Sequence, residues 1–101
     1  MRVLMQVQIP HGPFNAAVRD GSAGSKLEGI IEDIGPEAVY FHEMDGKRTA
    51  SLVVDLENAS QIPSLAEPFF LTFEADVRFH VVMSPEDLAN AGLEELGKKW
   101  G

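Results

Sequence analysis

Apolar and polar residues alternate in four short segments of the chain, which is the pattern of β-strands whose successive side chains face opposite sides of a sheet. The segments are residues 3–9, 37–43, 49–56 and 75–83. In the last of them every second residue from Ala75 to Met83 is apolar, and the residues between them are Asp76, Arg78, His80 and Val82. Each predicted strand therefore has one face suited to a core and another face that is largely polar.

The second and third segments are joined through an Asp-Gly dipeptide at residues 45–46. This dipeptide between alternating runs is a strong signal for a β-hairpin. A loop with an even number of residues places Val39 opposite Leu52 and gathers the apolar side chains of both strands on one face. An odd loop would shift the pairing and mix the two faces, so we expect an even loop. The apolar side chains are then Val39, Phe41, Ala50, Leu52 and Val54.

Helical periodicity, with apolar residues three and four positions apart, appears in two regions before the last strand. In residues 14–34 two apolar stripes point about 140° apart if each residue turns by about 100°. Residues 21–24 lie between the stripes and are glycine, serine, alanine and glycine. We therefore expect two short helices, or one sharply broken at this point. Residues 58–70 predict another helix with Ser60 as its N-cap, because Pro63 is best tolerated in a first turn.

The sequence after the last strand predicts a terminal helix. Ser84 followed by Pro85 and two acidic residues is a typical helix start, with a capping side chain and a proline that fits the first turn. We expect this helix to run from Ser84 toward Trp100, although Gly92 and Gly97 weaken it.

The element order is strand, broken helix, two-stranded hairpin, helix, strand and C-terminal helix. This βαββαβ order is that of the ferredoxin-like α+β fold. We expect a single domain over residues 1–101, with a four-stranded antiparallel or mixed sheet in the order fourth, first, third, second. The first and third strands are expected to be central and parallel, and the helices to cover the apolar face. That face carries Val3, Met5, Val7, Val39, Phe41, Leu52, Val54, Val77, Phe79 and Val81.

The opposite face of the predicted sheet is chemically mixed. It carries Leu4, Gln6, Gln8, Tyr40, His42, Thr49, Ser51, Val53, Asp55, Asp76, Arg78, His80 and Val82. This set is too polar for a core and unusually rich in functional side chains for a plain solvent surface. We expect a partly wet homodimer interface in which an acid pairs with Arg78, since a cation buried alone is costly. A solvent-exposed face on a monomer is the alternative.

Composition narrows the set of partners. The net charge of −8 disfavours nucleic acid, whose binding depends on lysine and arginine, and it also disfavours an anionic membrane surface. No signal-peptide pattern is present, and no apolar run approaches the roughly 20 residues of a membrane span. The chain has no cysteine, which excludes disulfides and a cysteine nucleophile. We expect a soluble, cytoplasmic protein without nucleic-acid or membrane partners.

A βαββαβ chain that opens on a strand and ends in an amphipathic tail resembles the dimeric α+β-barrel superfamily. This superfamily includes the muconolactone isomerases, the antibiotic-biosynthesis monooxygenases and many uncharacterised small bacterial proteins. The local likeness is strongest over residues 59–88, where Leu-Ala-Glu-Pro-Phe-Phe-Leu at residues 65–71 runs into the last strand, as in isomerase-like members. The resemblance implies that the mixed faces of two copies meet in a barrel, but a shared fold does not fix the chemistry.

Several side chains of the mixed face and of one loop are candidates for function. His80 stands among charged neighbours on the last strand, and Tyr40 and His42 lie together on the second strand; each could transfer a proton. A structural role in an interface or at an exposed edge is the alternative for each of the three. The candidate ligand-binding residues are His11, Gln6, Gln8 and Arg78.

Neither a metal nor a cofactor is expected. The histidines show no His-x-His or His-Glu-x-x-His spacing and no paired carboxylates, and no glycine-rich stretch continues as a phosphate loop. Haem-degrading members of the superfamily resemble one another in an asparagine on the first strand, a tryptophan in the pocket and a histidine. Here the first strand has Gln6 and Gln8, and the only tryptophan is Trp100 in the tail.

The expected function is the binding of a small, largely apolar organic molecule by a homodimer, with the ligand between sheet and helices or inside the barrel. Two alternatives remain open. One is a cofactor-free isomerase or monooxygenase that uses one of the proton-handling residues. The other is a non-catalytic association module.

Overall fold

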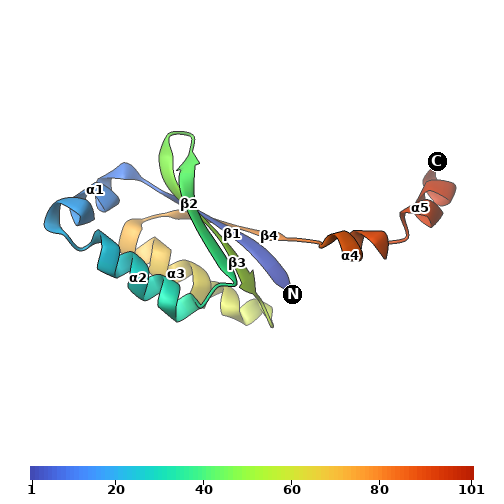
Figure 1. Ribbon diagram of the computed structural model, residues 1–101, viewed down its shortest axis with the longest axis horizontal. Coiled ribbons are helices and arrows are strands. Elements are labelled where there is room, and N and C mark those ends of the chain that lie inside the picture. The colour runs from blue at the N-terminus through green and yellow to red at the C-terminus, as the bar shows by residue number, and fades with distance from the viewer.

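A four-stranded antiparallel sheet with helices on one side forms the body of the protein (Figure 1), and the computed structural model describes all 101 residues. The strands are β1 (Arg2–Ile9), β2 (Ala38–Met44), β3 (Lys47–Asp55) and β4 (Asp76–Val81), in the sheet order β2-β3-β1-β4. The helices are α1 (His11–Asp20), α2 (Ala23–Ile34), the short 3-10 helix η1 (Ala59–Gln61), α3 (Ile62–Phe73), α4 (Pro85–Ala89) and α5 (Leu93–Trp100). The element order and the strand order are those of the expected ferredoxin-like fold.

The direction of the two central strands corrects the prediction. β1 and β3 are neighbours, but they run antiparallel, with Arg2 opposite Asp55 and Ile9 opposite Arg48. β1 and β4 are also antiparallel. The helices α1 and α2 return the chain so that β2 starts in the direction of β1, and the tight hairpin then reverses it. β3 therefore inserts between β1 and β2 with the opposite direction.

The hairpin itself has the predicted register. Val39 lies opposite Leu52, and the loop consists of only two residues, Asp45 and Gly46. Their φ angles are 54° and 75°, the positive values that a two-residue type I′ turn requires at both central positions. The apolar side chains of β3 consequently face the helices.

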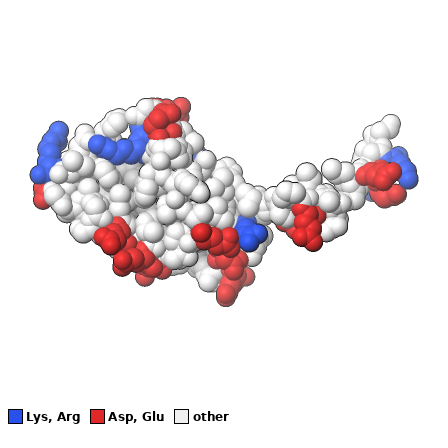
Figure 2. Space-filling model, in the orientation of Figure 1, with Lys and Arg blue, Asp and Glu red and all other residues white.

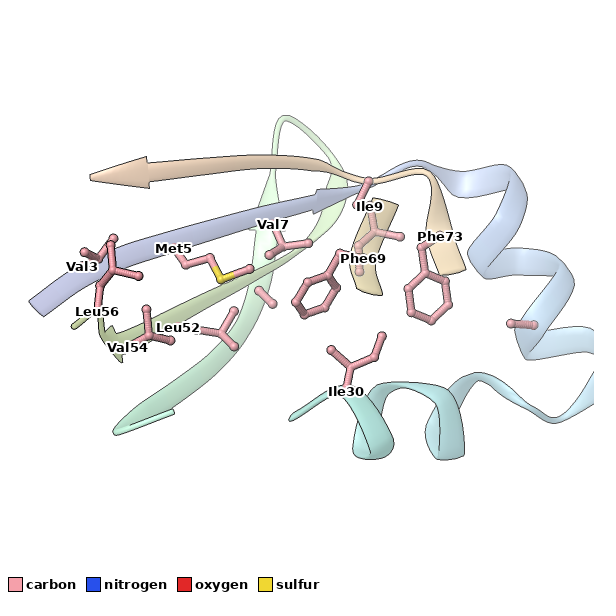
Figure 3. Packing of buried hydrophobic residues seen from close by; sticks show 13 residues of the cluster. Val3, Met5, Val7, Ile9, Ile30, Leu52, Val54, Leu56, Phe69 and Phe73 are labelled. Atoms are coloured by element: carbon pink, nitrogen blue, oxygen red, sulfur yellow. The ribbon is translucent and has the colours of Figure 1, made fainter. Parts of the chain in front are cut away.

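The centre of the core lies between β1 and α3 (Figure 3). Phe69 and Phe73 are both 0% exposed, and they lie four residues apart, on the same side of α3. Ile30 of α2 joins them from the second helix. α3 thus continues past the predicted end at residue 70, because Phe73 completes its buried stripe. The same cluster contains the β1 residues Val3, Met5, Val7 and Ile9. Val7 and Ile9 lie beside the rings, whereas Val3 lies at the other end of the cluster, next to Leu56.

The core is narrower than the alternation predicts. Phe41 of β2 is 58% exposed and Val81 of β4 is 67% exposed, although both were expected under the helices. Val77 and Phe79 are only partly buried against the core. β2 and β4 are the two edge strands, and the helix layer covers the central strands most completely.

The break between α1 and α2 falls where the two apolar stripes predict it. α1 ends at the C-cap Gly21, whose φ is 82°, and α2 begins two residues later.

The predicted N-cap of the helix after the hairpin is wrong. Asn58, not Ser60, caps the turn before α3: its side chain accepts a hydrogen bond from the Ser60 N–H, and the Gln61 side chain accepts one from the Asn58 N–H. Asn58 has the extended backbone that a cap needs.

Beyond Val82, whose N–H donates to the Arg2 backbone oxygen, the helices of the C-terminal segment do not pack on the body, and the segment is not one helix. α4 and α5 are separate, with Gly92 between them at a φ of 75°. Figure 1 shows both extending from the end of β4 away from the sheet. The radius of gyration is 17.1 Å, whereas a compact chain of about 100 residues has about 13 Å. We call residues 82–101 the C-terminal arm. No helix, in the arm or the body, is long and apolar enough to cross a membrane.

Candidate functional site

A cavity of about 260 Å³ lies between the first two helices and the hairpin end of the sheet. Four of its lining side chains are apolar, and the other three can form hydrogen bonds. They are Ile9, Phe14, Leu27 and Phe41, and His42, Arg48 and Thr49. The cavity thus occupies the space between sheet and helices, one of the two locations in which the sequence predicts a ligand.

Strands and helices each supply one wall of this cavity. Ile9 is the last residue of β1, and Pro10 follows it in an extended conformation that leads directly into α1. α1 brings Phe14 over the sheet, where its ring packs against Phe73 with ring centroids 5.2 Å apart. Leu27 comes from α2. The contact with Phe73 thus connects the Phe14 wall of the cavity to the core.

Arg48 is the charged group of the cavity. Its guanidinium lies 4.7 Å from the centroid of the Phe14 ring, and its Nη1 donates a hydrogen bond to the Asn15 side-chain oxygen at 2.8 Å. Glu43 lies opposite Arg48 in the hairpin, but its carboxylate accepts from the Gly46 N–H at 3.0 Å. Arg48 is in none of the ion pairs, which are Met1–Asp55, Arg2–Glu37 and Lys98–Glu95. The cation is oriented by neutral groups and has no carboxylate partner.

His42 borders the same cavity, and both of its ring nitrogens are engaged. Nδ1 lies 2.8 Å from the backbone oxygen of Glu43, and Nε2 lies 2.7 Å from the Ser51 hydroxyl. A carbonyl oxygen can only accept, so Nδ1 donates; in the neutral ring Nε2 then accepts from the hydroxyl. These two bonds fix the ring orientation at the edge of the sheet.

A second apolar hollow continues from the cavity along α2. It has a volume of about 330 Å³ and shares Leu27 and Phe41 with the first. Ile31 adds a further apolar side chain, and Glu28 and Glu32 stand at its rim. Phe41 therefore lies between two adjoining hollows, which explains why a residue of the covered face is largely exposed. Together the hollows form one apolar groove between α2 and β2.

Most of the predicted site residues lie on the other side of the sheet. Gln6 of β1 has Arg78 as its neighbour in β4 and Ser51 as its neighbour in β3, and Ser51 in turn pairs with Tyr40. Tyr40, Gln6 and Arg78 thus share one row across the face that carries no helix. We call this the open face. It places three predicted residues in one row, but Tyr40 and Arg78 lie on opposite edge strands, and none of the three lines the cavity.

His80 is remote from the two other candidates for proton transfer. It belongs to β4, whereas Tyr40 and His42 belong to β2, and these strands are the opposite edges of the sheet. Three strand spacings of about 4.8 Å separate them, or about 14 Å. Within one copy of the chain no single site gathers the three side chains.

Two further predicted ligand-binding residues have local roles or none. Gln8 is buried, and its side-chain amide donates a hydrogen bond to the Met44 backbone oxygen at 3.1 Å, which ties β1 to the hairpin. His11 is exposed at the first position of α1 and lines neither hollow. The structure therefore supports a structural role for Gln8.

Sequence reasoning missed Arg48 as a site residue, together with the apolar side chains around it. Because side chains alternate along β3, Arg48 is on the same covered face as Ala50, Leu52 and Val54. Arg48 also pairs with the buried Ile9 of β1. A cation at a position whose parity belongs to the core was the available signal. Its location beside a hairpin turn, where charged residues are usually solvated, concealed it.

The side chains with shifted pKa values lie away from the cavity. The hydrogen bond and charge of Glu37 raise the pKa of Arg2. A hydrogen bond with Ser22 lowers the pKa of Asp20, and hydrogen bonds with Ser84 lower that of Asp87. These shifts reflect turns and caps, so the cavity is identified by shape and charge placement. No three histidine or acidic side chains converge as metal ligands.

Comparison with known proteins does not assign the chain to a family. No family model matches it, and no curated protein matches it. Among solved structures it is similar to a de novo designed protein, Ferredog-Diesel, with 10% sequence identity and a TM-score of 0.46 over 80% of this chain and 85% of that chain. The fold described above therefore stands on the strand order and pairing of the chain itself.

Proposed function

We propose that the protein binds a small, largely apolar organic acid in the cavity between α1, α2 and the hairpin. The observation that supports this proposal is the placement of Arg48, a cation without a carboxylate partner at a cavity whose other walls are mainly apolar. Small-molecule sites are usually concave and apolar, with a few placed polar groups that fix orientation. A guanidinium recognises carboxylates well because its N–H donors form a planar fork.

The dimensions of the groove limit the ligand. The cavity of about 260 Å³ is slightly smaller than sites for drug-sized molecules, which have about 300–1,000 Å³. A single substituted ring fits a cavity of this size. The adjoining hollow lies beyond Leu27 and Phe41 and offers room for a short apolar chain, whereas Glu28 and Glu32 at its rim disfavour a second negative charge there. The preferred ligand is therefore a monoacid with its charge at the Arg48 end.

The test compares acids with neutral analogues of the same shape. Benzoate and phenylacetate are titrated against the protein by calorimetry, in parallel with benzamide and phenylacetamide. We expect the acids to bind more tightly than the amides. A hydrogen bond to a charged group contributes about 1.5–3 kcal/mol, so the difference should be about tenfold or more.

A matched pair of variants locates the binding site. Arg48→Gln removes the cation from the cavity, and Arg19→Gln removes an exposed arginine from the last turn of α1. Arg48→Gln should weaken acid binding at least tenfold and leave amide binding unchanged, while Arg19→Gln should change neither. Equal acid binding by wild type and Arg48→Gln would refute the proposal, as would the absence of binding by all four compounds.

A specific observation favours self-association as a second function. The open face is not covered by helices, yet Leu4 and Val53 lie side by side on it and are partly shielded by their neighbours. Gln6 and Arg78 stand next to them and can form hydrogen bonds across an interface. We propose that two copies associate through their open faces in a homodimer, the arrangement that the resemblance to dimeric α+β-barrel proteins implies.

A further inference from the structure

The C-terminal arm exposes more large apolar side chains than its length requires. Five of them lie between residues 83 and 100, and Trp100 at the tip is 78% exposed. Figure 2 shows that the charged side chains of the arm gather at two places and leave uncharged surface between them. A surface of this kind on a monomeric protein usually marks an interaction site. The five residues are Met83, Leu88, Leu93, Leu96 and Trp100.

The apolar residues of α5 form one side of an amphipathic helix. Leu93, Leu96 and Trp100 stand at i, i+3 and i+7, which is one helical face. The acidic pair Glu94 and Glu95 and the two lysines that follow occupy the other positions. Such a helix is suited to lie with its apolar side against a surface, but none of its residues is buried.

The two helices of the arm are too short to be stable by themselves. α4 has five residues and α5 has eight, whereas isolated helices below about 12–15 residues are marginal in water. Capping contributes only part of the difference. Stability of the arm as helices therefore requires a surface for packing.

The body of the same copy is poorly placed to supply that surface. Ser84 is extended, and its side chain and that of Asp87 form a reciprocal capping box at the start of α4. With Pro85 in the first turn, these bonds start α4 shortly after β4, and Figure 1 shows α4 directed away from the sheet. To fold back, the chain would have to reverse at Val82 and Met83, before the cap.

We propose that the arm of each copy docks on the body of a second copy, in a symmetric exchange that completes the dimer formed by the open faces. This inference rests on the proposed self-association. The arm begins at Val82, directly after β4 on the edge of the open face, so an interface across that face leads into the arm without interruption. In a dimer with two-fold symmetry each arm docks on one body and each body receives one arm.

The area of the open face supports the exchange. Four strands at about 4.8 Å spacing and about seven residues of about 3.4 Å give a footprint of roughly 450 Å² per copy. Two such faces give roughly 900 Å², below the roughly 1,200–2,000 Å² that stable complexes usually bury. A single buried aromatic side chain contributes about 150–250 Å², so two arms with Trp100 at their tips bring the total into this range.

The arm also has a concave side. α4 and α5 border an open hollow of about 540 Å³ whose lining includes Leu88 and Leu93 and also Glu94 and Glu95. Nothing within the chain fills it. In the exchanged dimer a convex part of the second copy occupies this hollow and covers both leucines.

The only tryptophan of the chain, Trp100, provides the test in the full-length protein. Light scattering gives the mass at each protein concentration, and tryptophan emission with acrylamide quenching gives the exposure of Trp100 in the same samples. We expect the dimer to show blue-shifted emission and weak quenching. Dilution to the monomer should restore the emission and quenching of an exposed tryptophan.

A pair of arm variants assigns this effect to the apolar side of α5. Leu93→Asp with Leu96→Asp should raise the dimer dissociation constant at least tenfold, while Lys98→Gln on the polar side should leave it unchanged. A dimer in which Trp100 is freely quenched would overturn the exchange but leave self-association intact. A monomer with exposed Trp100 would overturn both proposals, and a monomer with shielded Trp100 would show that the arm folds back on its own body.

Discussion

The helices α3 and α4 have opposite combinations of local signals and packing. α4 has a reciprocal capping box, a proline in its first turn and acidic residues near its N-terminus, but no buried residue. α3 has no side-chain cap on Gln61 and contains Pro68 in its interior, yet it buries Ala66, Phe69 and Phe73. An internal proline costs about 3 kcal/mol, so α3 persists only because its packing outweighs this cost.

This contrast separates the body, residues 2–81, from the arm. In the body tertiary packing stabilises elements whose local signals are imperfect. In the arm the local signals favour helix formation, but no other part of the chain packs against the helices and buries their residues. A segment with strong helix signals and an unburied apolar side is suited to a surface outside its own chain, whereas a flexible tail would need neither.

Truncation of the central core residue should have the largest effect on the body. Phe69→Ala removes a ring that is 0% exposed, and we expect a loss of about 3–5 kcal/mol in the free energy of unfolding. Phe79→Ala on the edge strand should lose about half as much, because Phe79 is only partly buried. Urea unfolding followed by circular dichroism measures both.

The matched control for this prediction is Leu96→Ala in the arm, measured at a concentration at which the protein is monomeric. It should change the unfolding free energy of the body by less than about 0.5 kcal/mol, as surface substitutions do. A loss similar to that of Phe79→Ala would mean that the arm packs on its own body and would abolish the contrast.

The open face should respond to Arg78→Ala through association rather than folding. Arg78 stands beside Gln6 in the central row of this face, and removal of a paired interface charge leaves its partner buried and unpaired. We expect the dimer dissociation constant to rise at least tenfold and the monomer to remain folded. Sedimentation equilibrium measures the constant, with Lys26→Ala on the exposed side of α2 as the control. An unchanged constant would remove Arg78 from the interface.

Two glycines with the same backbone angle offer a direct comparison of body and arm. Gly46 and Gly92 both have a φ of 75°, and a Cβ added at either position would meet no atom within 4 Å outside the glycine and its two chain neighbours. Alanine at either position is nevertheless strained by about 1–2 kcal/mol, because its Cβ approaches the following carbonyl oxygen. Gly46→Ala should lower the unfolding free energy of the body by about this amount, since the hairpin forms only in the folded state.

Gly92→Ala should leave the unfolding free energy of the monomeric body unchanged, because α5 can change its direction without cost to the core. It should instead weaken the dimer, since the angle between α4 and α5 depends on Gly92. Equal losses of body stability in both variants would show that the arm unfolds together with the sheet.

The sequence was sufficient for the fold because alternation and turn chemistry agree. Val39 pairs with Leu52 as predicted, since an odd loop would have exposed the apolar side chains and Asp45-Gly46 favours a two-residue turn. The direction of β3 relative to β1 was predicted wrongly. Side-chain alternation has no information on strand direction, which follows instead from the helical return to β2 and the hairpin reversal before β3. The division of the last helix into α4 and α5 was missed as well. Gly92 has a low helix propensity, but the helix breaks there only because it has no surface to pack against.

The cavity could not be derived from any single segment. Phe14, Leu27 and Arg48 are far apart in the chain, and each has an ordinary local explanation as a core or turn residue. Their meeting depends on the angle between α1 and α2 and on how far the hairpin extends past the helices. Neither quantity is encoded in periodicity, which is why the mixed strand face attracted the predicted site residues instead.

The smallest expected effect is a pH dependence confined to the start of α4. Hydrogen bonds from the Ser84 N–H, at 2.9 Å, and from the Ser84 hydroxyl hold the pKa of Asp87 below its ordinary 3.8, with a smaller contribution from the charge of Arg2. The folded arm thus prefers the charged carboxylate. The cap contributes fully above pH 3.8 and is lost as the pH falls through the lower pKa of the folded state.

An NMR titration of the Ser84 amide measures this pKa without interference from the body. We expect a midpoint below 3.8, and Ser84→Ala should raise it, because the variant loses the hydroxyl and weakens the reciprocal bond. The unfolding free energy of the body should not change in this variant, since no core residue contacts the cap. A wild-type midpoint at or above 3.8 would mean that α4 is uncapped in the free chain. The contrast between a capped α4 without buried residues and an α3 that lacks a side-chain cap but is buried would then fail.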